Sequence, residues 1–143
     1  DGNNNVSRSW MWAAKYLSFE FVVAAPKSCL PPQDFMDHLD APNVALTTAP
    51  AAAAKNADVI NTDVWLSMGQ EGQDEKEALF GNYEVNENLL SHCAPNHIVL
   101  HCLPAYRGKE ISEETLEAHA NTIFQQAENR LHSQKAVLAT LVE

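Results

Sequence analysis

Short apolar runs alternate with segments of helical periodicity along this chain. The first segment carries apolar residues at the spacing of one helix face: Val6, Trp10, Ala13, Ala14 and Leu17. Asparagines precede this segment, and asparagine is a preferred N-cap residue. The pattern therefore predicts a helix that starts within the first few residues.

The rest of the chain continues the alternation. Compact apolar runs predict strands over residues 19–24, 43–47, 58–62 and 97–102. Helix-forming segments predict helices over 33–39, 49–57, 74–80, 86–91 and 127–142, with a further short helix that begins at Ser112. Such alternation predicts an α/β fold, a largely parallel sheet with helices on both faces in a Rossmann-like three-layer sandwich.

A polar loop, residues 1–5, leads straight into the first predicted helix. In an α/β unit such a loop ordinarily follows a strand. We therefore expect the first strand to precede Asp1, so that residues 1–143 are a fragment that begins inside a domain.

Length, charge and cysteine content narrow the class of protein. A chain of 143 residues fits one domain. Nine basic against 19 acidic residues give a net charge of −10, which argues against nucleic-acid and acidic-membrane partners. No run approaches the roughly 20 apolar residues of a membrane helix. The three cysteines form no CxxC pair, so we expect no disulfide scaffold and a cytoplasmic location.

Three polar segments stand at or next to predicted strand ends, where open parallel sheets bind their ligands. They are residues 1–5, 63–71 and 101–104, the first following the strand expected before Asp1. We expect them to converge on one crevice. The glycine motifs of dinucleotide, P-loop and serine-hydrolase sites do not occur in the sequence.

A metal site is an alternative that the residue spacing raises. Cys93, His97 and His101 recur every four residues, and Cys102 follows. On a strand, His97 and His101 would share a face, but Cys93 falls before that strand, beyond Pro95. Closed metal sites need four well-placed ligands, so we expect no metal here.

Four motifs together resemble the ornithine carbamoyltransferases, within the aspartate/ornithine carbamoyltransferase family. They read Asp1-Gly2-Asn3-Asn4, Asp63-x-Trp65-x-Ser67-Met68-Gly69-Gln70-Glu71, His101-Cys102-Leu103-Pro104 and Ala127-Glu128-Asn129-Arg130. They occur in the family's order and cover the chain, but match only the family's C-terminal, amino-acid-binding half. The resemblance implies carbamoyl transfer from carbamoyl phosphate to the side-chain amine of L-ornithine, giving L-citrulline and phosphate. It implies no cofactor, and a homotrimer or a multiple of trimers.

The resemblance assigns ornithine binding to Asn4, Asp63, Ser67 and Met68. The chemistry agrees, because a carboxylate suits the α-ammonium of an amino acid and Asn4 and Ser67 can supply neutral hydrogen bonds. Taken singly, Asp63 could be a turn residue, Ser67 a helix cap and Met68 a core residue.

The resemblance places Cys102, Leu103 and Arg130 at carbamoyl phosphate, with Cys102 and Arg130 as catalytic residues. Cys102 would lie near the reacting amine, as its proton acceptor or only as an orienting group, or it is a buried small apolar residue. His101 either polarises the carbamoyl region or closes the strand. The guanidinium group of Arg130 could bind oxygens bidentately and stabilise the charge that develops in the reaction. Alternatively, it forms a surface salt bridge with Glu128 or another acid.

The family's phosphate-binding segments do not occur in this sequence. A Ser-Thr-Arg-Thr loop and a His-Pro-x-Gln segment belong to the family's N-terminal half, which is therefore the expected partner. Two rival interpretations stay open: a sister transcarbamylase that acts on another amine, or a non-catalytic amino-acid-binding fragment. An aspartate-specific enzyme would need cations for a second carboxylate, and residues 63–71 contain none.

Overall fold

The computed structural model of the chain describes residues 1–65 and 73–142. Its strands are β1 (Phe21–Ala24), β2 (Val44–Thr47), β3 (Val59–Thr62) and β4 (Ile98–His101). Its helices are α1 (Asn5–Leu17), the short 3-10 helix η1 (Lys27–Cys29), α2 (Gln33–Leu39), α3 (Pro50–Ala54), α4 (Gln73–Phe80), α5 (Glu87–Leu90), α6 (Glu113–Ala118) and α7 (Ala120–Leu141). The α/β class is therefore confirmed, with every predicted strand and helix present.

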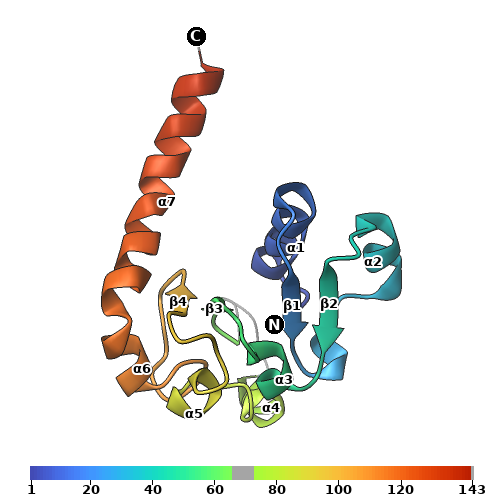
Figure 1. The fold of residues 1–143 in the computed structure, drawn as a ribbon, viewed down its shortest axis with the longest axis vertical. Helices are drawn as coiled ribbons and strands as arrows, with labels where there is room; N and C mark the ends of the chain where they lie inside the picture. Colours follow the sequence, from blue (N-terminus) through green and yellow to red (C-terminus); the bar gives the residue numbers. More distant parts are fainter. Residues whose placement is uncertain (66–72, 143) are drawn as a thin grey trace.

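The described strands form two parallel pairs, where the sequence predicted one sheet (Figure 1). β1 pairs with β2, so that Phe21 lies opposite Val44, and β3 pairs with β4, so that Thr62 lies opposite His101. No ladder joins the two pairs within the described residues. Asp1 lies between β1 and β3 in Figure 1. A strand that precedes Asp1 stays a prediction.

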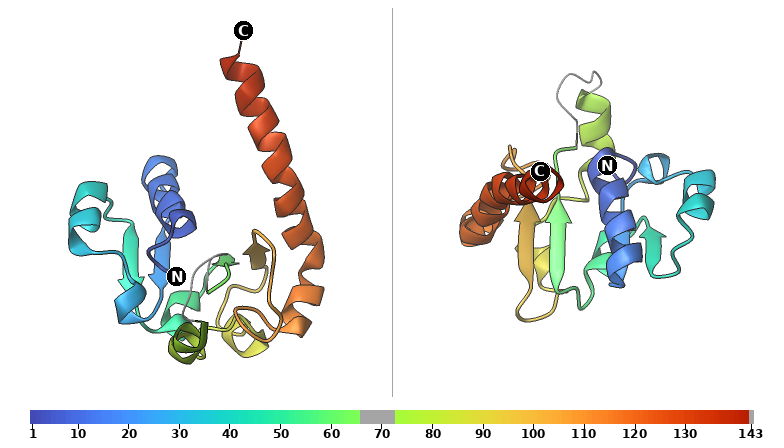
Figure 2. Two further views of the ribbon diagram at one scale, coloured as in Figure 1. Left: turned by 180° about the vertical axis from the view of Figure 1, so that it is seen from behind. Right: turned by 90° about the horizontal axis from the view of Figure 1, so that it is seen from above.

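Each pair of strands has its own hydrophobic core. The first core lies between β1–β2 and the helices α1 and α2, and its buried residues are Met11, Ala14, Val23, Leu39 and Val44. The second lies around β4 and the start of α7, and its buried residues are Val85, Leu90, Val99, Ile111, Leu116 and Ile123. The long C-terminal part of α7 extends away from both cores (Figure 2).

Local capping explains several of the boundaries. The side chains of Asn4, Asn86 and Ser112 accept the backbone N–H three residues on, which caps α1, α5 and α6. α3 ends before the predicted residue 57 because Asn56 adopts a left-handed conformation with φ of 57°.

The predicted start of the last helix at residue 127 was wrong, because α7 begins at Ala120. Its first turns bury Ile123 among polar residues, so their periodicity is weak in the sequence. The predicted apolar positions further along, such as Leu131 and Leu138, lie exposed. Within the described residues, no helix has both the length and the apolar character needed to cross a membrane.

Candidate functional site

The carboxyl ends of β3 and β4 bring two of the predicted site residues into contact. Thr62 and His101 are partners at the ends of the two strands, so the next residues along the chain, Asp63 and Cys102, also meet. The Cys102 thiol donates a hydrogen bond to Asp63 Oδ1, with an Sγ–Oδ1 distance of 3.2 Å. The same carboxylate oxygen accepts the backbone N–H of Val64 at 2.8 Å. Parallel register alone therefore places an acid and a thiol side by side.

These surroundings keep the Cys102 thiol protonated. Burial, together with the hydrogen bond and the negative charge of Asp63, raises the pKa of Cys102 from its usual 9.0 to about 11, with burial as the largest cause. The positive charge of Arg130 lowers the pKa, but it is the weaker influence. In the chain as described, Cys102 is therefore a neutral hydrogen-bond donor, and Asp63 is its acceptor.

Leu103 continues the site with an unusual backbone. Its φ of 57° lies in the left-handed region, which disfavours residues with a Cβ atom. Its side chain packs against the core around β4, and its backbone N–H donates to Nδ1 of the buried His101 at 2.9 Å. Backbone strain of this kind is typical of functional segments, and here it lies directly next to Cys102.

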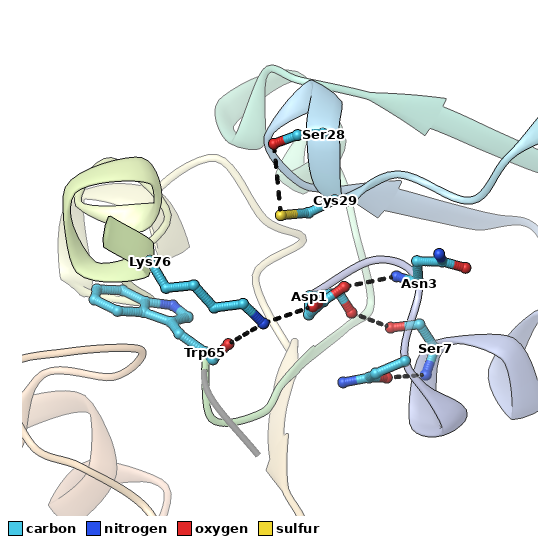
Figure 3. A network of polar contacts seen from close by, with 8 residues as sticks. Asp1, Asn3, Ser7, Ser28, Cys29, Trp65 and Lys76 are labelled. Carbon is cyan, nitrogen blue, oxygen red and sulfur yellow. Dashed lines mark hydrogen bonds and ion pairs between the residues drawn. The ribbon is translucent and has the colours of Figure 1, made fainter. Parts of the chain in front are cut away.

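The N-terminal loop lies at the end of β1. A Cβ atom on Gly2 would come within 2.8 Å of Val23 Cγ1 and 3.0 Å of the Cys29 carbonyl oxygen, so only glycine fits this close approach. Lys76 of α4 ties the loop to the second polar segment, because its Nζ lies 3.0 Å from Asp1 Oδ2 and 3.2 Å from the Trp65 carbonyl oxygen (Figure 3).

Asn4 follows in the same loop as the N-cap of α1. Its Oδ1 accepts the Ser7 N–H at 2.9 Å, and the Ser7 hydroxyl donates to the Asp1 carbonyl oxygen at 2.7 Å. Asp63 also acts on this loop electrostatically. Burial lowers the pKa of the Asp1 amino group, and the negative charge of Asp63 opposes that change. The structure therefore brings the first two predicted segments near each other.

Arg130 lies on α7, which packs along β4. The residue is exposed, and its charge acts on the Cys102 thiol. One turn earlier on the same helix side, Gln126 has a buried Oε1 that lacks a hydrogen-bond partner among the described residues. Unpaired buried acceptors are uncommon and call for an explanation, but nothing in the sequence distinguishes Gln126 from a surface glutamine.

Two predicted ornithine-binding residues, Ser67 and Met68, lie outside the described residues. Their assigned roles stay predictions.

The predicted metal-ligand series separates in the structure. His97 Nδ1 lies 2.8 Å from the Ala94 carbonyl oxygen, and its ring lies against that of His119. Among the described residues, the potential ligand atoms of Asp63, His101 and Cys102 lie within 4.8 Å of one another. Both ring nitrogens of His101 already have partners, so a metal would have to displace one of them. The donor set is better suited to hydrogen bonding than to metal binding.

Sequence reasoning missed Glu110, which contacts the other ring nitrogen of His101. It is one of the few buried polar side chains in the described residues, with 1% of its surface exposed. Its neighbours Lys109 and Ile111 gave no sign of burial at this position. A buried acid next to a motif histidine is visible only once the loop after β4 is folded.

Comparisons with known proteins identify the family. Residues 1–141 match the family described as aspartate/ornithine carbamoyltransferase, Asp/Orn binding domain. A protein named ornithine carbamoyltransferase from Akkermansia muciniphila is 60% identical over 144 residues, covering 100% of this chain and 47% of that protein. A relative of the same name from Campylobacter fetus is 48% identical, with 96% and 47% covered.

Solved structures agree as well. The ornithine carbamoyltransferase from Pyrococcus furiosus superimposes with a TM-score of 0.87 at 41% identity, over 97% of this chain and 46% of that one. The anabolic ornithine carbamoyltransferase from Campylobacter jejuni gives a TM-score of 0.86 at 38% identity, over 94% and 46%. The chain thus spans about half the length of the curated relatives it matches.

Proposed function

The chain belongs to the aspartate/ornithine carbamoyltransferase family, and we propose that it forms the ornithine-binding domain of an enzyme that makes L-citrulline. In this reaction the side-chain amine of L-ornithine attacks the carbamoyl carbon of carbamoyl phosphate, and phosphate leaves. The Asp63–Cys102 contact carries the proposal, because it joins an acid and a polar thiol at the carboxyl ends of β3 and β4, where open parallel sheets bind their ligands.

Asp63 is proposed to bind the α-ammonium group of ornithine. Its carboxylate is half-buried and has no cationic partner among the hydrogen bonds described, which leaves it able to pair with a ligand cation. A charge-assisted hydrogen bond to a carboxylate is the strong form of such a contact. Asn4, at the start of α1, and Ser67 and Met68 complete the proposed ornithine set.

Cys102 is proposed to orient the reacting amine rather than to remove its proton. A thiol whose pKa lies at about 11 remains protonated near neutral pH, so it donates a hydrogen bond and cannot accept a proton. Its hydrogen bond to Asp63 fixes the direction of the Sγ atom. Orientation of an amine against a carbonyl carbon supplies a large share of the barrier lowering in such reactions.

Arg130 and the backbone at Leu103 are proposed to contact carbamoyl phosphate. A guanidinium group can bind the carbonyl oxygen and the phosphate oxygens, and it stabilises the negative charge that develops when the amine attacks. The phosphate-binding segments of the family are expected in an N-terminal half, which this chain needs for turnover.

The test is a chimera in which this chain replaces the corresponding half of the Akkermansia muciniphila relative. We expect the chimera to form citrulline from ornithine and carbamoyl phosphate. Asp63→Asn should raise the KM for ornithine far more than that for carbamoyl phosphate, because loss of a buried charge pair costs about 2–5 kcal/mol.

The matched control is Asp58→Asn, the same change at the exposed, opposite end of β3. It should leave both KM values unchanged. If Asp63→Asn raised the KM for ornithine and the KM for carbamoyl phosphate equally, the assignment of Asp63 to ornithine would be contradicted. Activity on another amine in preference to ornithine would favour a sister transcarbamylase.

A further inference from the structure

Glu110 and His101 form a buried polar pair directly behind the candidate site. Their side chains are 1% and 0% exposed, and His101 Nε2 lies 3.1 Å from Glu110 Oε1. Burial of two such groups is costly unless each is hydrogen-bonded, so every contact of the pair matters. His101 is the last residue of β4 and immediately precedes Cys102.

The contacts of the pair define one form of the His101 ring. The backbone N–H of Leu103 donates to Nδ1 at 2.9 Å. Because a backbone N–H can only donate, Nδ1 carries no proton and the ring proton lies on Nε2. Nε2–H then donates to Glu110 Oε1, so Glu110 and the Leu103 N–H stabilise the same tautomer from opposite sides of the ring.

Glu110 also holds the far end of the loop. The same Oε1 accepts the backbone N–H of Tyr106 at 2.6 Å. The segment that follows Cys102 is thus attached at both ends, by Leu103 to His101 and by Tyr106 to Glu110. The attachment at Leu103 matters most, since this residue has the left-handed φ of 57° and needs a compensating contact.

The main chain of Glu110 is fixed to the end of β3. Its carbonyl oxygen accepts the Val85 N–H at 2.9 Å and lies 3.4 Å from the Thr62 hydroxyl, which can donate to it. Thr62 is the strand partner of His101 and immediately precedes Asp63. Glu110 therefore links the two strand ends that carry Asp63 and Cys102.

We propose that Glu110 is a positioning residue for the carbamoyl-transfer reaction, acting through the His101 tautomer and the Leu103 N–H to set the direction of the Cys102–Leu103 backbone. The inference rests on the proposed function of that segment. Glu110 touches neither proposed substrate position itself. Its contribution is the orientation of groups that do, which affects turnover more than ground-state binding.

Two substitutions separate this role from a packing role. Glu110→Met keeps the side-chain length and removes the acceptor, whereas Glu110→Gln keeps an amide oxygen where Oε1 lies. Glu20→Ala, at an exposed position before β1, is the control. The direct measurement is the ¹⁵N NMR spectrum of histidine-labelled protein, which reports which ring nitrogen carries the proton; His101→Gln identifies its signals among the six histidines.

We expect His101 to be wholly in the Nε2–H form in the wild type and in Glu110→Gln, and to become a tautomer mixture in Glu110→Met. In the chimera, Glu110→Met should lower kcat about 10- to 100-fold with little change in either KM. Glu110→Gln should recover most of that loss, and Glu20→Ala should match the wild type.

An Nδ1–H form of His101 in the wild type overturns the proposal even if Glu110→Met fails to fold. Equal kcat losses in the Gln and Met variants, or a loss confined to KM, also overturn it. The spectrum is independent of activity. A chimera without citrulline synthesis but with the expected tautomers would thus reject the proposed function and leave the His101–Glu110 geometry standing.

Discussion

At the scale of single residues, the environment of Cys102 reverses the usual expectation for a motif cysteine. Nucleophilic cysteines have a lowered pKa and a cationic neighbour. Here burial and the Asp63 carboxylate raise the pKa to about 11, and the Arg130 charge only partly opposes them. The thiol is therefore a donor that depends on its acid neighbour.

Alkylation should reveal this dependence. In a Cys29→Ser, Cys93→Ser background, the rate of Cys102 alkylation by iodoacetamide should rise with a midpoint near pH 11. Asp63→Asn should move the midpoint toward the usual 9.0, because the negative charge is removed, and should speed the reaction at pH 9 by about tenfold. A midpoint near 9.0 in the chain that keeps Asp63 would mean that neither the burial of Cys102 nor its Asp63 contact is present in solution.

The same shift predicts how stability changes with pH. In the unfolded chain the Cys102 thiol has its usual pKa of 9.0, whereas in the folded chain its pKa is about 11. Between these two pH values the folded state therefore binds more protons than the unfolded state. The free energy of unfolding should therefore fall across that window, by at most about 2–3 kcal/mol. Urea unfolding at pH 8 and pH 11 measures this fall in the free energy of unfolding. In a Cys93→Ser background, the further change Cys102→Ser should make the fall smaller.

At the scale of elements, α7 has two halves with different surroundings. Ile123, in its first turns, is fully buried against β4, whereas Leu138, near its end, is 61% exposed. Apolar residues at exposed positions contribute little to the free energy of folding of the chain itself. The sequence pattern alone does not distinguish the two positions.

Paired substitutions on α7 should show this difference. Ile123→Ala should reduce the free energy of unfolding by about 2–5 kcal/mol, because it leaves a cavity in the core. Leu138→Ala, a comparable truncation, should change it by less than about 0.5 kcal/mol. Thermal unfolding of the 143-residue chain measures both. A large loss in Leu138→Ala would show that the end of α7 is covered in solution.

Local signals account for what the sequence predicts well at this scale. The four strands lie within the predicted apolar runs, and Asn4 and Ser112 cap helices as their residue types favour. The Asp63–Cys102 contact follows from two strand ends that share one register. The family resemblance is confirmed by the match over residues 1–141.

The remaining features depend on contacts between segments distant in space. Glu110, the side-chain partner of His101, is brought to it by the turn that follows Cys102. The Lys76 link to Asp1 joins residues 75 positions apart, more than half of the chain. The division of the strands into two pairs has no local signal in the sequence either. The apolar pattern of each strand would be the same in one sheet as in two.

At the scale of the whole molecule, the proposed reaction needs more than this chain contains. Arg130 is exposed, and the phosphate-binding segments of the family do not occur in the sequence. The relatives are about twice as long as the matched region. Assembly into trimers and a cytoplasmic location stay predictions for the longer protein.

The 143-residue chain should therefore form no detectable citrulline by itself. An exposed ion pair with Arg130 contributes only about 0–1 kcal/mol, too little to hold carbamoyl phosphate at useful concentrations. Ornithine should bind in the millimolar range at best, about 4 kcal/mol, because Asp63 and Asn4 supply only one side of its site. Isothermal titration and a colorimetric citrulline assay measure the two quantities.

Supplying the N-terminal half of the Akkermansia muciniphila relative as a separate chain should restore activity, because that half is expected to carry the missing phosphate-binding segments. The restored rate should saturate with the concentration of the added half, as it must when the active species is a complex of the two. The same mixture made with the Asp63→Asn chain should require far more ornithine for half-maximal rate, whereas Asp58→Asn should behave as the wild type. Citrulline formed by the 143-residue chain in the absence of its partner would contradict this division of the site, since carbamoyl phosphate would then be bound by residues 1–143 themselves.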